Sequence, residues 1–269
     1  MEKALSLIRG ITDPGLALNR LREYLQAFIL RSFHESEAFR PLVFVGGTAL
    51  RFLYDLPRFS EDLDFSLSTA AGYTPTLWLG RLKRDLALSG FHPEVTWNDR
   101  RTVNTAEIRI PGLLKTAGLS GREEQKLSIK LEIDTCPPPG GRCERRIVTR
   151  HLTFFVQHHD LPSLMSGKLH AILCRPHPKG RDWYDLIWYL SRCPPLTPNV
   201  ALLQAALDQT RGTGLVDASS WRDLVQGRLN SLDVGKLAQD VAPFLEHQPE
   251  TALLTRANLE TLLQSRTTS

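Results

Sequence analysis

The sequence has 269 residues, of which 42% are hydrophobic and 23% charged, with a formal net charge of +4 and a mean hydropathy of −0.21. This composition is that of an ordinary globular protein and excludes a disordered or fibrous chain. No apolar stretch approaches the roughly 20 residues that a bilayer requires, and the start of the chain lacks the apolar region of a signal peptide. We therefore expect a cytoplasmic protein without a membrane segment.

The distribution of charge and the cysteine content indicate which kinds of binding surface and cross-link the chain could have. Residues 100–150 contain eleven basic and six acidic side chains, whereas the chain from residue 194 onward contains six basic and eight acidic ones. A basic segment in a nearly neutral protein is typical of a surface that binds a polyanion, and a solvated loop is the alternative. The four cysteines are scattered and none has C-x-x-C spacing, which argues against a disulfide scaffold or a cysteine zinc site.

The first part of the chain alternates between helical and strand patterns. Asp13 and Pro14 suit a helix N-cap and first helical position, and apolar residues recur beyond them at helical spacing. A short apolar strand is predicted at 42–45, followed directly by a glycine pair and a helix through residue 54. Residues 62–67 alternate between polar and apolar, which predicts a half-buried strand with Asp62 and Asp64 on one face.

The rest of the chain is predicted to end in helices. We expect a helix at 77–88, a strand near 105–110, a second alternating strand at 127–134, and helices at 162–174 and 181–190. Helices are also predicted near 200–210, 219–229, 234–246 and 256–265. We predict a body of residues 1–193 and a helical domain of residues 194–269. The aromatic residues Trp183, Trp188 and Tyr189 are expected in the core, and base-stacking platforms are the alternative.

Three carboxylates, Asp62, Asp64 and Asp134, are predicted to face the same way from two strands. Glu132 lies on the same face as Asp134, so either could be the third carboxylate. Mg²⁺ prefers oxygen ligands and usually takes one or two carboxylates, with water and substrate phosphate completing its shell. The glycine turn at 46–48 offers backbone N–H groups and a helix N-terminus to phosphates. These features are typical of metal-assisted phosphoryl or nucleotidyl transfer.

Two sets of residues resemble a known family. Gly46-Gly-Thr-Ala-Leu-Arg51, followed by Arg58-Phe-Ser-Glu-Asp-Leu-Asp-Phe65, resembles the signature of AbiEii-type nucleotidyltransferases, toxins of type IV toxin–antitoxin systems. Lys168-Leu-His-Ala171 and Gly180-Arg-Asp-Trp-Tyr-Asp-Leu186 resemble the family's other hallmark, a helical lysine followed by an R-D-x-x-D-L element. The resemblance implies an α/β (α+β) fold: a polymerase-β-like nucleotidyltransferase core, with a mixed sheet flanked by helices, plus a C-terminal helical bundle.

The resemblance also implies roles for individual residues. The catalytic residues would be Asp62, Asp64, Lys168 and Asp182. The ligands of Mg²⁺ or Mn²⁺ would be Asp62, Asp64 and Asp134. The nucleotide-binding residues would be Gly46, Gly47, Thr48, Arg51 and Ser60.

Two of these assignments have alternatives in the sequence itself. Lys168 would neutralise phosphate charge, and its position near an apolar face also favours an anionic partner, although a snorkelling lysine fits as well. Asp182 would orient Lys168 or the acceptor. It shares one side of a helix with Asp185, which is the alternative functional acid, and Asp182 also suits a helix N-cap.

These roles describe an enzyme that transfers a nucleoside monophosphate from an NTP onto an acceptor. The resemblance suggests an RNA acceptor such as the 3′ end of tRNA, which would inhibit growth, and a cognate antitoxin as a partner. Four arginines are candidates for contacts with the RNA backbone: Arg142, Arg145, Arg146 and Arg150. The alternatives are transfer to a small molecule or a protein, and a non-catalytic nucleotide- or RNA-binding module. The intact D-x-D motif argues against the last.

Overall fold

The computed structural model describes residues 1–122 and 124–265, which fall into two compact units. The sheet unit comprises Met1–Asp55, Phe59–Pro137 and Cys143–His158. The helical unit comprises Leu56–Arg58, Pro138–Arg142 and the chain from His159 onward. These two units are defined by packing. The predicted boundary after residue 193 separates a catalytic body from a helical C-terminal domain, and this functional division stays a proposal.

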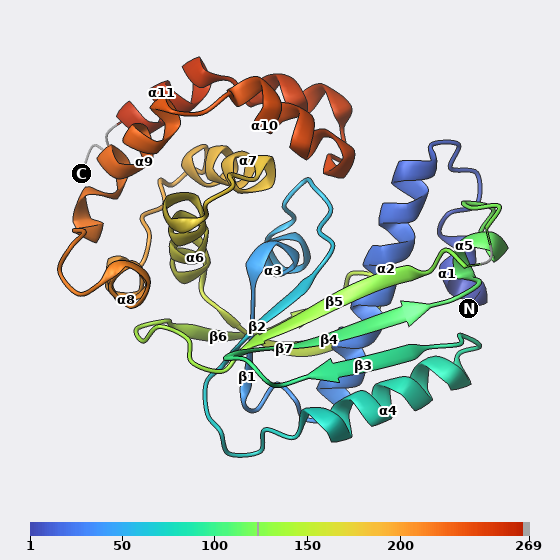
Figure 1. Cartoon of the computed structure of the whole chain (residues 1–269). Helices are drawn as coiled ribbons and strands as arrows, with labels where there is room; N and C mark the ends of the chain where they lie inside the picture. Colours follow the sequence, from blue (N-terminus) through green and yellow to red (C-terminus); the bar gives the residue numbers. More distant parts are fainter. Residues whose placement is uncertain (123, 266–269) are drawn as a thin grey trace. The chain divides into compact units, whose positions relative to one another are not determined.

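Within the described residues, seven strands form one mixed sheet in the order β3-β4-β5-β2-β1-β7-β6 (Figure 1). At its centre, β2 pairs antiparallel with β1 and parallel with β5. This confirms the predicted mixed sheet flanked by helices. The elements that complete this sheet, with their covering helices, are α1 (Glu2–Ser6), α2 (Pro14–Glu35), β1 (Leu42–Val45), α3 (Gly46–Tyr54), β2 (Leu63–Leu67), α4 (Pro75–Leu88), β3 (Glu94–Asn98), β4 (Val103–Ile110), α5 (Leu113–Thr116), β5 (Leu127–Asp134), β6 (Cys143–Val148) and β7 (Phe154–His159).

Local sequence signals account for the elements around the centre of the sheet. The Asp13 carboxylate accepts a hydrogen bond of 2.7 Å from the Leu16 N–H, so the predicted N-cap of α2 is confirmed. Alternation also holds in β2, where Leu63 and Phe65 are buried and Asp64 is half-buried. Helix α4 packs against α2 and beside β3 (Figure 1). Burial of alternate side chains thus sets which face of β2 carries the aspartates.

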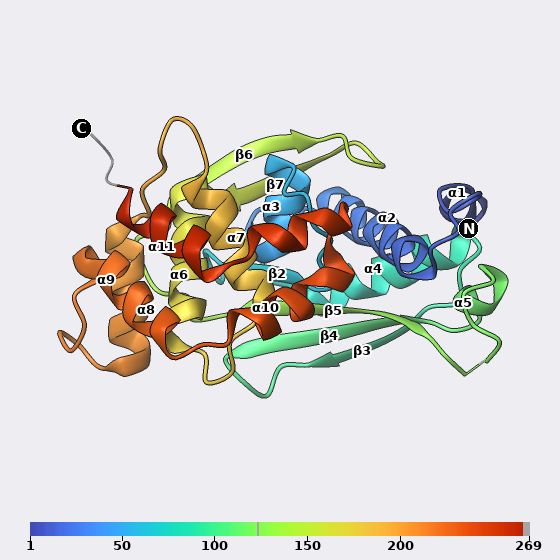
Figure 2. The same ribbon diagram turned by 90° about the horizontal axis from the view of Figure 1, so that it is seen from above.

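The helical unit is built around α6 (Leu161–Cys174) and α7 (Gly180–Leu190), which pack against each other. Helices α8 (Val200–Arg211) and α9 (Trp221–Asn230) pack on α6, and α10 (Val234–Val241) and α11 (Arg256–Gln264) pack on α7 (Figures 1 and 2). The predicted helical tail is therefore confirmed. No helix in residues 1–122 and 124–265 is long and apolar enough to cross a membrane.

Three strands of the sheet, β3, β6 and β7, were not predicted from the sequence. Of these, β6 is an edge strand inside the basic segment 100–150, for which a solvated loop was the alternative to a polyanion-binding surface. Five of its six side chains are exposed, so its sequence shows no polar and apolar alternation. Charged side chains such as those of Glu144, Arg145 and Arg146 are common on edge strands, where they discourage pairing with another chain.

A buried carboxylate links α2 to α3 in the sheet unit. Glu23 of α2 is 2% exposed and pairs with Arg51 of α3 at 2.6 Å and with the His151 ring at 2.7 Å. Burial opposes ionisation of Glu23, but the His151 hydrogen bond and the Arg51 charge outweigh it and lower the pKa of Glu23 to about 2. The ion pair therefore holds in place the helix that begins at Gly46.

This carboxylate predicts a pH-dependent contribution to stability. Because the pKa of Glu23 is lower in the folded protein than its ordinary value of 4.5, the contribution is fully present above pH 4.5 and is lost as the pH falls towards 2. Its size is about 3 kcal/mol. We expect Glu23→Gln to lower the free energy of urea unfolding at pH 7, with a smaller difference from wild type at pH 3. A difference that does not change with pH would contradict the ionised carboxylate.

Candidate active site

The predicted glycine turn and the D-x-D motif meet at one point of the sheet unit. Val45, the last residue of β1, pairs with Asp64 of β2, so the Asp64 side chain lies against the start of α3. Gly46 has φ +78°, and a Cβ there would stand 2.1 Å from Asp64 Oδ2. Only glycine accommodates both the left-handed backbone and this approach. The geometry places a carboxylate beside a helix N-terminus, where backbone N–H groups favour anions.

The other predicted nucleotide-binding residues surround this turn in different ways. Thr48 is buried, and its hydroxyl donates to the backbone carbonyl of Asp62, which ties α3 to the D-x-D motif. The backbone carbonyl of Ser60 accepts from the Gln26 side chain at 2.9 Å. Gly47 lies in the first turn of α3. These contacts position the motif, and phosphate binding by these residues stays a proposal.

Arg51 lies further along α3 and is largely enclosed. Its guanidinium is 2% exposed, pairs with Glu23 at 2.6 Å and stacks over Phe59 at 4.6 Å from the ring centroid. The Arg51 guanidinium held in this way joins α3 to α2 and so stabilises the position of α3. Its predicted contact with the nucleotide stays a proposal, and the burial favours a structural role.

The register of β2 and β5 decides which carboxylates are neighbours. Glu132 pairs with Asp64, whereas Asp134 pairs with Ser66, two residues further along the strands. Among the described residues, no group of three or more His, Cys, Asp or Glu side chains could hold a metal ion. The structure therefore does not bring Asp62, Asp64 and Asp134 together as a three-carboxylate centre. Of the two candidates for a third acid, Glu132 is the register partner of Asp64, and a third carboxylate ligand stays a proposal.

A lysine that the sequence analysis did not consider sits on the same acidic strand face. Lys130 of β5 pairs with Glu132, and this hydrogen bond, with the charges of Glu132, Asp62 and Asp64, raises the pKa of Lys130. The carboxylates of this strand face therefore stabilise the positive charge of the Lys130 ammonium. Two half-buried aspartates also suit Mg²⁺, which commonly takes only one or two protein carboxylates. The donor set fits a divalent ion completed by water and phosphate.

The helical unit holds the remaining predicted catalytic residues in a cluster of five charged side chains. Lys168 of α6 lies 2.9 Å from Asp182 and 2.8 Å from Asp185, both on α7. Arg175 pairs with Asp182 at 2.6 Å, and Arg58 makes two hydrogen bonds of 2.6 Å to Asp185. We call these residues the Lys168 cluster. Its three cations exceed its two carboxylates, so these side chains carry one net positive charge.

Electrostatics within the Lys168 cluster favour the charged forms. Burial disfavours the ammonium of Lys168, but Asp182 and Asp185 outweigh it and raise the pKa of Lys168. Burial likewise opposes ionisation of Asp182, and the charges of Lys168 and Arg175 reverse the effect and lower the pKa of Asp182. Lys168 is therefore a cation at neutral pH. Its partners are two carboxylates, so the snorkelling alternative does not describe it.

Asp182 does not cap α7. The N-cap is Lys179, and Asp182 lies buried in the first turn with its carboxylate directed to Lys168 and Arg175. Asp185 also contacts Lys168, so both candidate acids touch the lysine.

Arg58 and Arg175 are the residues of this cluster that the sequence analysis left without a role, and Arg58 is the more buried of the two. It is 1% exposed, its partner Asp185 is 0% exposed, and the Asp185 carboxylate raises the pKa of Arg58 against the effect of burial. A signal was present in the sequence, because Arg58 stands inside the first motif and Asp185 inside the second. Only folding shows that the two motifs share an ion pair across 127 positions of the chain.

Breaking this pair should destabilise the protein strongly. Removing one partner of a buried pair leaves an uncompensated charge and costs about 3–5 kcal/mol. We expect Arg58→Ala to lower the free energy of urea unfolding at pH 7 by about 3 kcal/mol, since Lys168 still contacts Asp185. The double variant Arg58→Met/Asp185→Leu should recover part of the loss. A loss below about 1 kcal/mol in Arg58→Ala would contradict this assignment.

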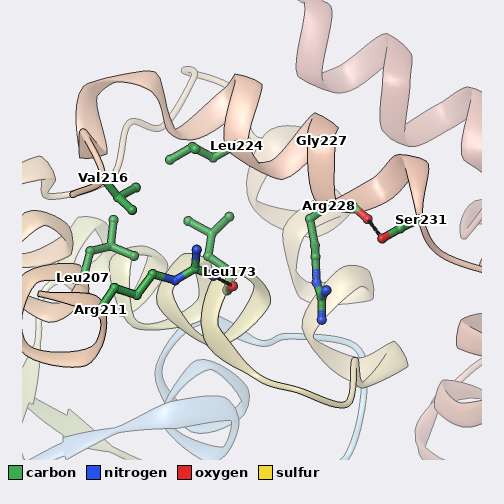
Figure 3. A pocket seen from close by; sticks show the side chains of 8 residues that line it. All are labelled: Leu173, Leu207, Arg211, Val216, Leu224, Gly227, Arg228 and Ser231. Atoms are coloured by element: carbon green, nitrogen blue, oxygen red, sulfur yellow. Dashed lines mark hydrogen bonds between the residues drawn. The ribbon is translucent and has the colours of Figure 1, made fainter.

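A pocket of about 330 Å³ opens between the end of α6, α8 and α9 (Figure 3). Arg211 donates to the carbonyl of Leu173, and Arg228 donates to the carbonyl of Arg175 at 2.9 Å. Arginines commonly satisfy the last carbonyls of a helix in this way. We interpret both as caps of α6 and not as ligand-binding residues.

Comparison with protein-family models agrees with the motifs. A family model described as Nucleotidyl transferase AbiEii toxin, Type IV TA system, matches residues 28–265. A crystal structure of a candidate nucleotidyltransferase from H. pylori is 22% identical, with a TM-score of 0.49, covering 90% of this chain and 93% of that one. The structure of JHP933 from Helicobacter pylori is 22% identical, with a TM-score of 0.48, covering 90% of each chain. No curated protein matches this chain.

Proposed function

This chain belongs to the AbiEii family of nucleotidyl transferase toxins from type IV toxin–antitoxin systems, and we propose that it transfers a nucleoside monophosphate from an NTP to an RNA acceptor, with Mg²⁺ or Mn²⁺. The 3′ end of tRNA is the first acceptor to test. The observation that carries the proposal is the contact of Asp64 with the glycine turn at the start of α3. A metal-binding carboxylate and a phosphate-binding helix N-terminus are the two parts that this chemistry needs side by side.

In this proposal the residues of the chain bind and orient a triphosphate. The acceptor hydroxyl oxygen forms a bond to the α-phosphorus and gives up its proton to solvent, while the bond from the α-phosphorus to the bridging oxygen breaks and pyrophosphate leaves. Asp62 and Asp64 would hold the divalent ion, which would neutralise charge at the phosphate oxygens when bound. Gly46 and Gly47 offer backbone N–H groups to the phosphates. Lys168 balances their negative charge, and Asp182 orients Lys168.

The test uses each of the four α-³²P-labelled NTPs with the purified full chain, total RNA, and MgCl₂, MnCl₂ or EDTA. The expected result is label in an RNA band with one or more NTPs, dependent on the divalent ion. Label only in a small molecule or in protein would favour the alternative acceptors. No transfer under any condition would favour the non-catalytic binding module. Co-expression with a neighbouring antitoxin gene tests the partner that family membership suggests.

The RNA acceptor can also be tested through its charge. Arg145 on β6 is exposed, whereas Arg146 donates to the Leu53 carbonyl and stacks over Tyr54. If both meet phosphates, replacing them with alanine should reduce the slope of log K against log salt by roughly 1.4 for single-stranded RNA. The matched control is Arg40→Ala, since Arg40 is 76% exposed in the same unit. An unchanged slope in the double variant would place the RNA elsewhere.

A further inference from the structure

A second pocket of the helical unit lies along one face of α7. Its volume is about 470 Å³, which is within the range of small-molecule sites. Tyr184, Ile187 and Trp188 of α7 line it, at the i, i+3 and i+4 spacing of one helix face. Arg192 and Glu250 are its charged lining residues. The proposed nucleotidyl transfer assigns no role to these side chains.

The aromatic wall of this pocket corrects an expectation from the sequence. Trp183 and Tyr189 are buried in the core as predicted, at 1% and 0% exposure. Trp188 is instead only half-buried, and it lines the pocket. The Arg192 guanidinium lies 4.6 Å from the centroid of the Trp188 ring. A flat ring with a stacked guanidinium is the combination on which proteins stack unpaired nucleobases.

The polar end of the pocket offers hydrogen-bond acceptors. The Tyr184 hydroxyl donates to the Glu250 carboxylate. Burial, together with this hydrogen bond, raises the pKa of Tyr184, so the hydroxyl stays protonated and remains a donor. It takes one of about four acceptor positions on the carboxylate. A carboxylate at the edge of a stacked base can accept from an exocyclic amino group, as it does from the N4 amine of cytosine.

The pocket adjoins the Lys168 cluster on the same helix. Tyr184 directly precedes Asp185, and Pro57, which lines the pocket, directly precedes Arg58. The charges of Asp185 and Arg58 both act on Tyr184. A base in this pocket would therefore lie against the same helix, α7, that carries Asp182 and Asp185 of the Lys168 cluster.

We propose that this pocket binds a nucleobase with an exocyclic amino group, stacked on Trp188 and held at its edge by Glu250. The inference rests on the proposed nucleotidyl transfer. The base belongs either to the NTP or to the terminal nucleotide of the RNA acceptor, and the two sources are separated by experiment.

Binding is measured without turnover, in full-length protein carrying Asp62→Asn. One arm titrates the four NTPs by calorimetry, and the other titrates 5′-fluorescein hexanucleotides of C, A and U by anisotropy. Trp188→Ala should weaken binding about fivefold or more, because stacking of one base is worth at least that factor. Trp188→Phe should retain most of the affinity. An effect on NTPs assigns the pocket to the donor nucleotide, and an effect on the oligonucleotides alone assigns it to the acceptor.

Two further variants sharpen the test. Glu250→Gln should reduce the preference for amino-bearing bases over uracil. Arg192→Ala changes an exposed side chain and should weaken binding of the same ligand as Trp188→Ala does. If the Trp188→Ala protein does not fold, Arg192→Ala takes its place in the test. The charge control is Lys236→Ala, at an 82% exposed lysine of the same unit, which should leave affinity unchanged.

Affinities within twofold of the parent in Trp188→Ala and Arg192→Ala would refute the proposal that the pocket binds a nucleobase. An unchanged base preference in Glu250→Gln would refute recognition of the exocyclic amino group. Because each arm contains either the NTP or the oligonucleotide and never both, no transfer to RNA can occur, and the result does not depend on whether the Asp62→Asn variant has lost transfer.

Discussion

Replacing Asp62 with asparagine will abolish nucleotidyl transfer in a protein that still folds. Asp62 and Asp64 lie half-buried at β2, and Asp64 adjoins the N-terminus of α3. Asparagine keeps the shape of the side chain but removes the charge that a divalent ion requires. Loss of a metal ligand should cost several kcal/mol of transition-state stabilisation, which is a decrease in rate of at least about a hundredfold.

The measurement is transfer of labelled nucleotide to RNA, together with growth of cells that express the variant. Urea unfolding shows whether the fold survives, since the backbone carbonyl that Thr48 contacts is unchanged by the substitution. Asp99→Asn is the matched control, because Asp99 is exposed in the same unit and has no proposed role. Transfer and toxicity at wild-type levels in Asp62→Asn would refute the catalytic assignment.

Lys168→Ala should reduce turnover by about a hundredfold, the order of magnitude seen when a positioned group that stabilises developing charge is removed. The ammonium of Lys168 is held between Asp182 and Asp185 at 2.9 and 2.8 Å, and its side chain keeps 13% exposure. This partial exposure leaves room for a phosphate oxygen as a further partner. Lys168→Arg should rescue only in part, because the planar guanidinium is larger and its donors diverge.

Stability and turnover must be measured on the same preparations, since Lys168→Ala also leaves two buried carboxylates with fewer partners. If Lys168→Arg restores the free energy of unfolding but not kcat, the lysine acts on the substrate. If turnover returns in proportion to stability, Lys168 only supports the fold. Turnover of Lys168→Ala within threefold of wild type would contradict any role in transfer.

The sequence by itself determined the local features of the protein. The pattern at Asp13 and Pro14 predicted the start of α2, and the alternation from Asp62 onward predicted β2 and the face that its aspartates share. These features depend on neighbouring residues, through capping and through burial of alternate side chains. The two motifs likewise identified the family, which matches residues 28–265.

The tertiary structure alone decided which distant groups meet. The register of β2 on β5 places Glu132, and not Asp134, beside Asp64, and alternation cannot reveal this because both acids lie on one face. The pairing of Arg58 with Asp185 likewise joins two motifs far apart in the chain. Strand β6 escaped prediction because an edge strand exposed on both faces needs no apolar alternation. Strand register and long-range ion pairs depend on how elements pack, which no local sequence pattern encodes.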